Sequence, residues 1–198
     1  MSGSEQAPAR ETSGVPARYR CLLDVQRAQA DGETVEPQVY RRFDTQHTLL
    51  VAAMANPHAL LATGLTSSDF DAPDYGILWM AMENAMKANP SLAKVEFADL
   101  SEQARRMSER FQQPDGQHMM LRLLRDTPVS LEYALTVLVR ELRAFDDLRT
   151  WKDAVKNFVD RVDSTSDPLA LKQEWIIKAQ AVAQKYDTGQ SVKALDEA

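Results

Sequence analysis

The chain has 198 residues, of which 44% are hydrophobic and 26% charged, and its formal net charge is −6. This composition suits one ordinary domain with a hydrophobic core, and it excludes wholesale disorder. The acidic balance argues against a dedicated nucleic-acid coat protein or a polybasic membrane binder, because both concentrate Lys and Arg. The single cysteine, Cys21, can form neither an internal disulfide nor a thiolate metal cluster, so we expect a reducing compartment.

The apolar runs of the chain are too short to span a membrane. The longest, Leu49 to Ala55, ends at Asn56-Pro57 and falls well below the roughly 20 residues that a spanning helix needs. Residues 1–15 lack the apolar stretch of a signal peptide and are predicted to form a disordered tail. We therefore expect a cytoplasmic protein.

Residues 16–43 are predicted to form an N-terminal helical extension. One helix is expected from Pro16 to about Ala30. Pro37 is expected to open a second segment, because proline suits the first turn of a helix. Asp44 is a favourable N-cap residue and predicts the start of the next helix.

Residues 44–128 are predicted to form a compact helical head. Helix formers dominate this region, and Val, Ile and Thr do not gather into the alternating patterns of strands. A polar helix is expected through about Phe111, then a loop over residues 112–116 and a short helix from His118 to Arg125. Residues that stop or open helices mark the other boundaries: Asn56-Pro57, Gly64, Pro73, Asn89-Pro90 and Thr127-Pro128.

Residues 129–187 are predicted to form a long antiparallel helical hairpin, so that the whole chain is all-α. No Gly or Pro occurs from Ser130 to Val162, and apolar residues recur there in steps of three or four, which indicates one helix of about 33 residues. A second long helix is expected from Leu169 to Tyr186. Two such helices alone bury little apolar surface, so we expect association with another copy. The alternative is that the hairpin folds back onto the N-terminal helices.

The predicted partner surface is an apolar stripe on this hairpin. Large side chains usually carry most of the binding energy of an interface, and the candidate interface residues are Leu138, Leu142, Phe145, Leu148, Trp151 and Trp175. Charges of both signs flank the stripe, which favours a solvated or partner-matching face over a nucleic-acid face. Residues 188–198 are expected to form a C-terminal tail or a short linker helix.

The chain lacks the common catalytic motifs. It has no Gly-rich loop leading into Gly-Lys-Ser/Thr for phosphate binding and no Gly-x-Ser-x-Gly element of a serine hydrolase. No second His or Cys stands at metal-ligand spacing from any of the three histidines. These histidines are expected to be polar surface or capping residues: His47, His58 and His118.

Two other candidate sites also have structural interpretations. Cys21 would need a histidine partner to act as a nucleophile, and we expect instead a small buried or half-buried thiol. Asp69, Asp71 and Asp74 lack the central Gly and terminal Glu of a calcium loop, and they are expected to cap a turn and the start of a helix. We therefore predict a protein that is not an enzyme, with no catalytic, cofactor-binding or metal-binding residues.

A series of helical motifs runs from about residue 44 to residue 162. The motifs, in order, are Gln46 to Pro57, Ser67 to Phe70, Tyr75 to Met82, Val95 to Leu100, Asp126 to Pro128, Glu132 to Ala134 and Val139 to Glu141. In this order and spacing they resemble the N-terminal domain of DnaB-type replicative helicases. The end of the chain, Val192 to Ala198, is similar to the linker helix of that family, but the helicase motor with its phosphate-binding loop is missing.

The resemblance implies a helical head and a hairpin that packs against the hairpin of another subunit. In the helicases these domains form a collar and receive the primase. The implied partners are a replicative helicase, a primase or further copies of this chain in a homodimer or higher homo-oligomer, without a membrane and with only indirect contact with nucleic acid. The family's Glu-rich, Gly-Gly-containing stretch is replaced by Ser101 to Gln117, so its primase contacts are not transferred. The sequence fits both a stand-alone relative and the N-terminal part of a helicase.

Two further classes of function stay open at this point. A DNA-binding replication or partition factor would use Arg105, Arg106 and Arg110, or the pair Arg41-Arg42, although the net charge of −6 weighs against it. A cofactor-free enzyme would need a site assembled from dispersed residues, which a convergent polar pocket in the fold would reveal.

Overall fold

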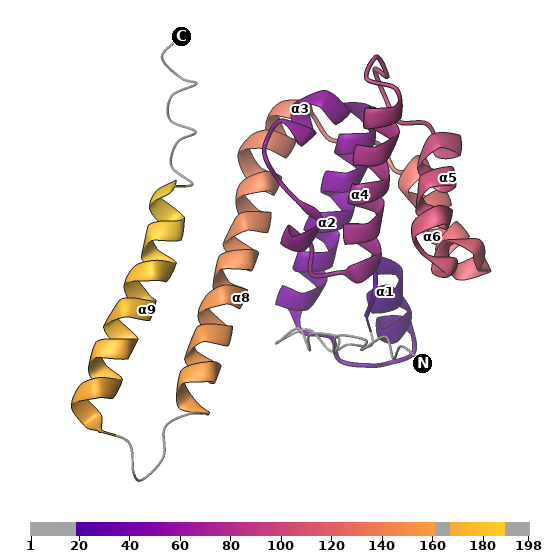
Figure 1. Cartoon of the computed structure of the whole chain (residues 1–198). Coiled ribbons are helices and arrows are strands. Elements are labelled where there is room, and N and C mark those ends of the chain that lie inside the picture. Colours follow the sequence, from indigo (N-terminus) through magenta and orange to yellow (C-terminus); the bar gives the residue numbers. More distant parts are fainter. Residues whose placement is uncertain (1–18, 161–166, 189–198) are drawn as a thin grey trace, which may run out of the picture. The chain divides into compact units, whose positions relative to one another are not determined.

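The computed structural model describes residues 19–160 and 167–188 (Figure 1). All regular secondary structure in these residues is helical, which confirms the predicted all-α class. The chain divides into two compact units, Met1–Asp146 (unit 1) and Asp147–Ala198 (unit 2). The predicted segments 1–15 and 188–198 lie outside the described residues, apart from Thr188. The helical elements are α1 (Leu22–Ala30), α2 (Pro37–Ala55), α3 (Pro57–Leu61), η1 (Ser67–Asp69), α4 (Pro73–Ala88), α5 (Phe97–Met107), η2 (Glu109–Gln112), α6 (Pro114–Arg125), α7 (Leu131–Tyr133), the π-helical η3 (Ala134–Leu138), α8 (Val139–Val159) and α9 (Pro168–Thr188).

Helix α1 begins at Leu22, later than the sequence predicts, because a local capping interaction sets its start. The Asp24 carboxylate accepts hydrogen bonds from the backbone amides of Arg20 (2.8 Å) and Cys21 (3.3 Å). These bonds hold the chain in an extended conformation just before the helix, and they satisfy donors that a helix N-terminus leaves unpaired. Residues 16–18 of the predicted helix lie outside the described part of the chain.

The prediction that a helix starts at Asp44 is wrong. Helix α2 continues without interruption from Pro37 to Ala55, and Asp44 is an exposed residue within it. Val39, Phe43 and Leu50 are all buried on this helix. The apolar face therefore extends past Asp44, and burial of that face outweighs the local capping preference of one residue.

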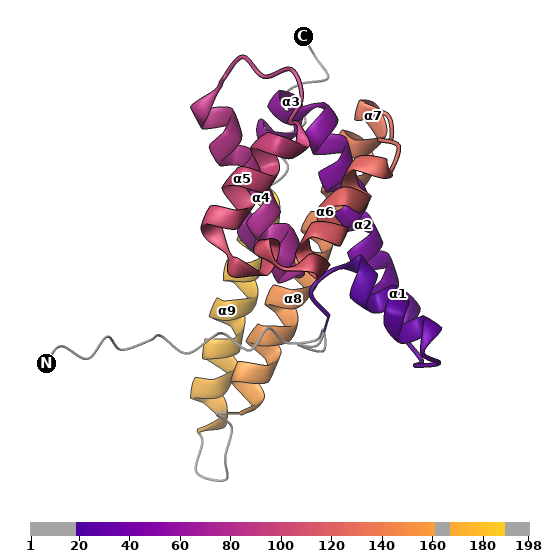
Figure 2. The same ribbon diagram turned by 90° about the vertical axis from the view of Figure 1, so that its right-hand side faces the viewer.

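Helices α2 and α4 lie against each other in the middle of unit 1, and α5 and α6 cover them on one side (Figure 2). The largest side chains that this arrangement buries completely include Trp79, Tyr75, Phe43 and Phe111. The indole N–H of Trp79 donates to the Leu65 carbonyl at 3.2 Å, so the polar atom of this buried ring is satisfied. Residues of the predicted extension contribute to the same core: Cys21, Leu22, Val25, Ala28, Val39 and Phe43.

The predicted polar helix through Phe111 is divided into two elements. Helix α5 ends at Met107, and the Ser108 side chain then accepts a backbone N–H at the start of the short helix η2. Helix α6 begins at Pro114 rather than at His118, because proline is compatible with the first turn of a helix. Only Gln113 lies between η2 and α6, so the connection is shorter than the loop predicted over residues 112–116.

The long helix predicted from Ser130 is present as three successive elements, α7, η3 and α8, which follow one another without a break. The π-helical segment η3 changes the helical register, because each π turn holds an extra residue. Leu138, the last residue of η3, and Leu142, in the first turn of α8, are buried in the core of unit 1. The boundary between the two units falls within α8, after Asp146.

The described part of unit 2 consists of the C-terminal part of α8 and of α9, which agrees with the second long helix predicted from Leu169 to Tyr186. Figure 1 shows the two helices side by side. Trp175 of α9 contacts Trp151 and Phe158 of α8, with ring centroids 6.4 Å and 5.0 Å apart. Among the described residues, no helix has both the length and the apolar character needed to cross a membrane.

Candidate interaction site

Unit 2 exposes large apolar side chains on both of its helices. Leu148 and Val159 of α8 are 64% and 60% exposed, and Leu169 and Ile177 of α9 are 64% and 65% exposed. Among the residues of unit 2 whose exposure is described, all are half-buried or exposed. Clustered apolar side chains of this size on a surface usually mark an interaction site.

The exposed apolar residues follow a helical repeat. Leu148, Val155 and Val159 have spacings of seven and four residues, which place them on one face of α8; we name this set the α8 stripe. Leu169 and Ile176 are seven residues apart and form the α9 stripe. Each helix therefore exposes apolar side chains beside the aromatic residues that join the two helices.

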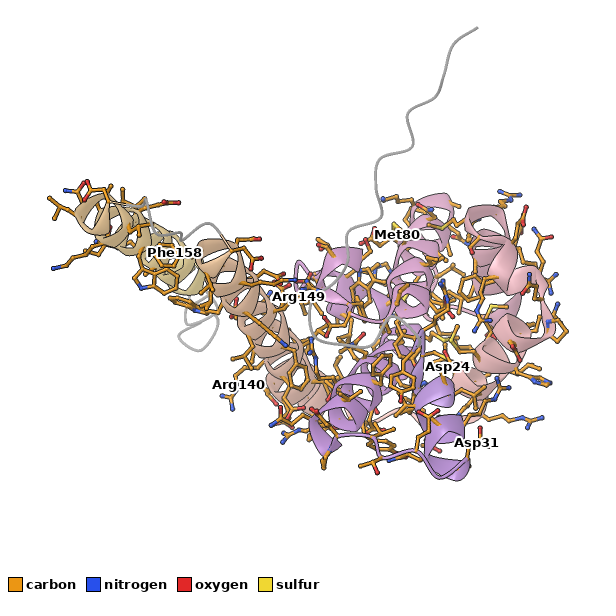
Figure 3. The ribbon with its side chains drawn as sticks, turned by 90° about the horizontal axis from the view of Figure 1, so that it is seen from below. Asp24, Asp31, Met80, Arg140, Arg149 and Phe158 are labelled. Atoms are coloured by element: carbon orange, nitrogen blue, oxygen red, sulfur yellow. The ribbon has the colours of Figure 1, made fainter. Side chains whose placement is uncertain are left out.

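The aromatic contacts lie directly beside the α8 stripe, because Trp151 comes three residues after Leu148 and four residues before Val155. Trp151 and Phe158 are seven residues apart, and both rings contact Trp175. Figure 3 labels Phe158 and shows its ring on the side of α8 that lies towards α9. Of the predicted interface residues, Trp151 and Trp175 therefore contact each other within unit 2, and Leu148 is the one that is largely exposed.

Three of the predicted interface residues belong to unit 1 instead. Leu138 and Leu142 are 4% and 0% exposed in its core, so they are unavailable to a partner of the folded protein. Phe145 is half-buried beneath the Arg42 guanidinium, which lies 5.5 Å from the ring centroid. A charge introduced at Leu142 would destabilise unit 1 and would not report on association.

The sequence prediction missed most of the exposed apolar residues of unit 2. It did not single out Val159, Leu169, Ile176 and Ile177 as interface candidates. The seven-residue spacing of Leu169 and Ile176 is visible in the sequence. The sequence prediction instead chose Trp175 as the interface residue of α9, because Trp175 has the larger side chain.

The three arginines proposed for nucleic-acid contact differ in their environments. Arg110 Nε donates to Asp74 Oδ2 at 3.1 Å, and its side chain is only 22% exposed. Arg106 is exposed and paired with Glu102, one helical turn away on α5. Arg105 is exposed and has no acidic partner within the described part of the chain. The other proposed pair is also engaged, Arg41 with Glu141 and Arg42 with Asp71.

His47 is a core residue, which corrects the prediction that it lies on the surface or caps a helix. Its Nδ1 atom lies 3.1 Å from the Tyr75 hydroxyl, which also accepts the backbone N–H of Leu22 at 2.9 Å. Its Nε2 atom lies 2.6 Å from the Asp126 carboxylate. An ionised carboxylate can only accept hydrogen bonds, so we assign the ring proton of His47 to Nε2. The Tyr75 hydroxyl then donates its hydrogen bond to Nδ1.

This hydrogen-bond chain joins α1, α2, α4 and the end of α6, so its effect is structural. Burial lowers the pKa of His47, although the hydrogen bond and negative charge of Asp126 act in the opposite direction. A neutral imidazole satisfies all of these bonds. A protonated ring would leave the buried Tyr75 hydroxyl proton without its acceptor.

Asp74 is completely buried, and it is paired with two cations. Arg20 donates to its Oδ1 atom from Nε (2.9 Å) and Nη2 (2.8 Å), and Arg110 donates to Oδ2. Asp69 accepts the backbone N–H of Thr66 at 2.6 Å, which confirms its predicted role as a turn cap. Among the described residues, no group of three or more His, Cys, Asp or Glu side chains is placed to hold a metal ion.

Cys21 is the buried thiol that the sequence predicts, with 1% of the residue exposed. Burial, with the nearby Asp24 charge, raises the pKa of this thiol to about 11. The thiolate is the nucleophilic form, so Cys21 is unsuited to attack a substrate at neutral pH.

Comparison with protein families, curated proteins and solved structures finds no match for this chain. The interpretation of the exposed surfaces therefore depends on their own geometry and on the sequence.

Proposed function

We propose that the protein is a non-catalytic protein-interaction module that self-associates through the α8 and α9 stripes. The proposal is carried by the exposure of the stripe residues. Leu148, Val159 and Leu169 are each at least 60% exposed, and Val155 and Ile176 are 41% and 45% exposed. Burying one Leu or Ile side chain contributes roughly 1.5 to 3 kcal/mol. A second copy presents the same stripes, so a two-fold contact buries the stripes of both copies. The contact also stabilises two helices that are marginally stable alone.

The polar residues beside the stripes support a selective contact. Lys152 and Lys156 are exposed on α8, and Asp160 follows at its end. Charges at the rim of an apolar contact mainly determine register and partner choice rather than affinity. The proposal includes an antiparallel α8–α9 hairpin in each copy, in a cytoplasmic protein.

The proposed setting is DNA replication, with a replicative helicase or a primase as the heterologous partner. This part of the proposal is supported by the resemblance of residues 44–162 to the N-terminal domain of DnaB-type helicases. The head would correspond to the collar domain of that family, and the hairpin to the element through which neighbouring subunits associate. Contact with DNA would be indirect, since most of the candidate arginines already pair with carboxylates of the same chain.

Co-purification of two differently tagged copies tests the self-association. The wild-type pair should co-purify, and Leu148→Asp combined with Ile176→Asp should abolish recovery, because both place a charge in the apolar contact. Asn157→Asp is the control, since it adds one negative charge at an exposed polar position on the opposite side of α8 from Leu148. Equal recovery of all three pairs would contradict the proposal.

A separate experiment tests the replication setting. The tagged chain is used for affinity purification from a lysate of its own cells, and bound proteins are identified by mass spectrometry. Recovery of a replicative helicase or primase is the expected result. Recovery of neither would contradict the replication setting, while the self-association would be judged by the tagged pair alone.

A further inference from the structure

Unit 1 carries an open groove whose lining includes no residue of the two stripes or of the buried polar network. Its volume is about 990 Å³, and it lies along α5 and beside the turn from η2 into α6. The residues that define its character are Phe97, Glu102, Arg105, Arg106, Gln112 and Gln117.

The basic side of the groove is formed by two exposed arginines at the C-terminal end of α5. The guanidinium of Arg105 has no acidic partner among the described residues. Arg106 is paired with Glu102, but these side chains are 66% and 59% exposed. An exposed ion pair of this kind contributes little to stability, so an incoming carboxylate can replace Glu102 at small cost.

The rest of the groove suits a peptide backbone and an apolar side chain. The amide of Gln112 donates to the Arg105 carbonyl at 3.3 Å, and that of Gln117 donates to the Gln112 carbonyl at 3.1 Å. The side-chain carbonyl oxygens of both amides are still able to accept peptide N–H groups. Phe97 is half-buried at the start of α5 and offers an aromatic surface for packing.

We propose that this groove binds a short acidic peptide segment of a partner protein. The carboxylates of the segment pair with Arg105 and Arg106, for which the planar guanidinium is well suited, and an apolar side chain packs on Phe97. A nucleic acid fits the groove less well, because phosphate-backbone binding requires many cationic contacts and the lining of the groove provides two arginines. The proposal extends the protein-interaction function to unit 1, and it does not depend on self-association through unit 2.

Fluorescence anisotropy with the full chain tests the proposal. The probe is a short fluorescein-labelled peptide of Asp and Glu residues that contains Phe. The control probe has the same sequence with Asn and Gln in place of the acidic residues. The acidic probe should bind, and the amide probe should bind at least about tenfold more weakly. Absence of binding by the acidic probe, or equal binding of both, would overturn the proposal.

Three exposed-site variants locate the binding. Arg105→Gln combined with Arg106→Gln should weaken binding about tenfold. Arg125→Gln, an exposed arginine of α6 outside the groove, is the control and should have little effect. Glu102→Gln should strengthen binding, because it removes a competing carboxylate and releases Arg106. Similar weakening by Arg125→Gln, or no change with Glu102→Gln, would contradict binding in this groove.

Two further measurements distinguish this peptide site from a nucleic-acid site and from the self-association surface of unit 2. A single-stranded oligonucleotide of similar length should bind more weakly than the acidic peptide, and tighter, salt-dependent binding would show a nucleic-acid site instead. The variant with Leu148→Asp and Ile176→Asp should bind the peptide like the wild type. A loss of peptide binding in that variant would contradict the independence of the groove from unit 2.

Discussion

Unit 1 buries most of its large apolar side chains, whereas unit 2 leaves many of its own in solvent. The difference is clearest on α8, which belongs to both units: Leu142 is 0% exposed in the core of unit 1, and Leu148, six residues later, is 64% exposed. The aromatic side chains show the same contrast. Trp79 and Tyr75 are fully buried in unit 1, while Trp151 is only half-buried in unit 2. Unit 1 therefore has a complete core, and unit 2 has apolar faces that another molecule can cover.

The largest expected effect contrasts these two leucines. Leu142→Ala should lower the free energy of unfolding of unit 1 by about 3 kcal/mol, because it removes buried methyl groups and leaves a cavity. Leu148→Ala should change it by less than about 0.5 kcal/mol. Amide hydrogen exchange of α2 peptides measures this quantity for unit 1 alone. Similar losses from both substitutions would show that the two units do not differ as described.

A smaller effect is expected at the buried carboxylate of unit 1. Asp74→Asn should lower the free energy of unfolding by about 2 kcal/mol, because Arg20 and Arg110 lose their shared ionic partner. Asp115→Asn is the control: its side chain is 50% exposed, and its pairs with Arg27 and Arg110 should contribute no more than about 0.5 kcal/mol. Urea unfolding measures both variants, and equal changes would contradict a stabilising role for the burial of Asp74.

The smallest expected effect is a pH dependence of unit 1 that arises from His47. Its pKa is lowered in the folded state by burial, so the unfolded chain binds a proton more readily. The stability of unit 1 should therefore fall as the pH drops below about 6.5, the ordinary pKa of histidine. His47→Gln should be less stable at neutral pH and should lose this part of the pH dependence. An unchanged pH profile in the variant would rule out His47 as its source.

The sequence predicted helix boundaries well where a single residue sets them. Asn56-Pro57 separates α2 from α3, and Pro73 opens α4. Gly64 follows α3 with a φ of +74°, a conformation that glycine adopts at little cost. These features act locally, so they can be inferred without knowledge of the fold.

The incorrect predictions concern features that depend on tertiary contacts. Asp44 has the right chemistry for an N-cap, but the apolar face on both sides of it keeps α2 continuous. His47 and Asp74 are polar residues in the core, and their partners come from distant parts of the chain. Periodicity predicts an apolar face along the whole of α8. It does not show that Leu142 on this helix is buried while Leu148 is exposed.

The most direct test of the central claim is the mass of the full chain by sedimentation equilibrium over a range of protein concentrations. The monomer mass is 22.2 kDa. We predict an integer multiple of this mass for the wild type and a return to the monomer for Leu148→Asp combined with Ile176→Asp. A wild-type mass of 22.2 kDa at every concentration would contradict self-association through the two stripes.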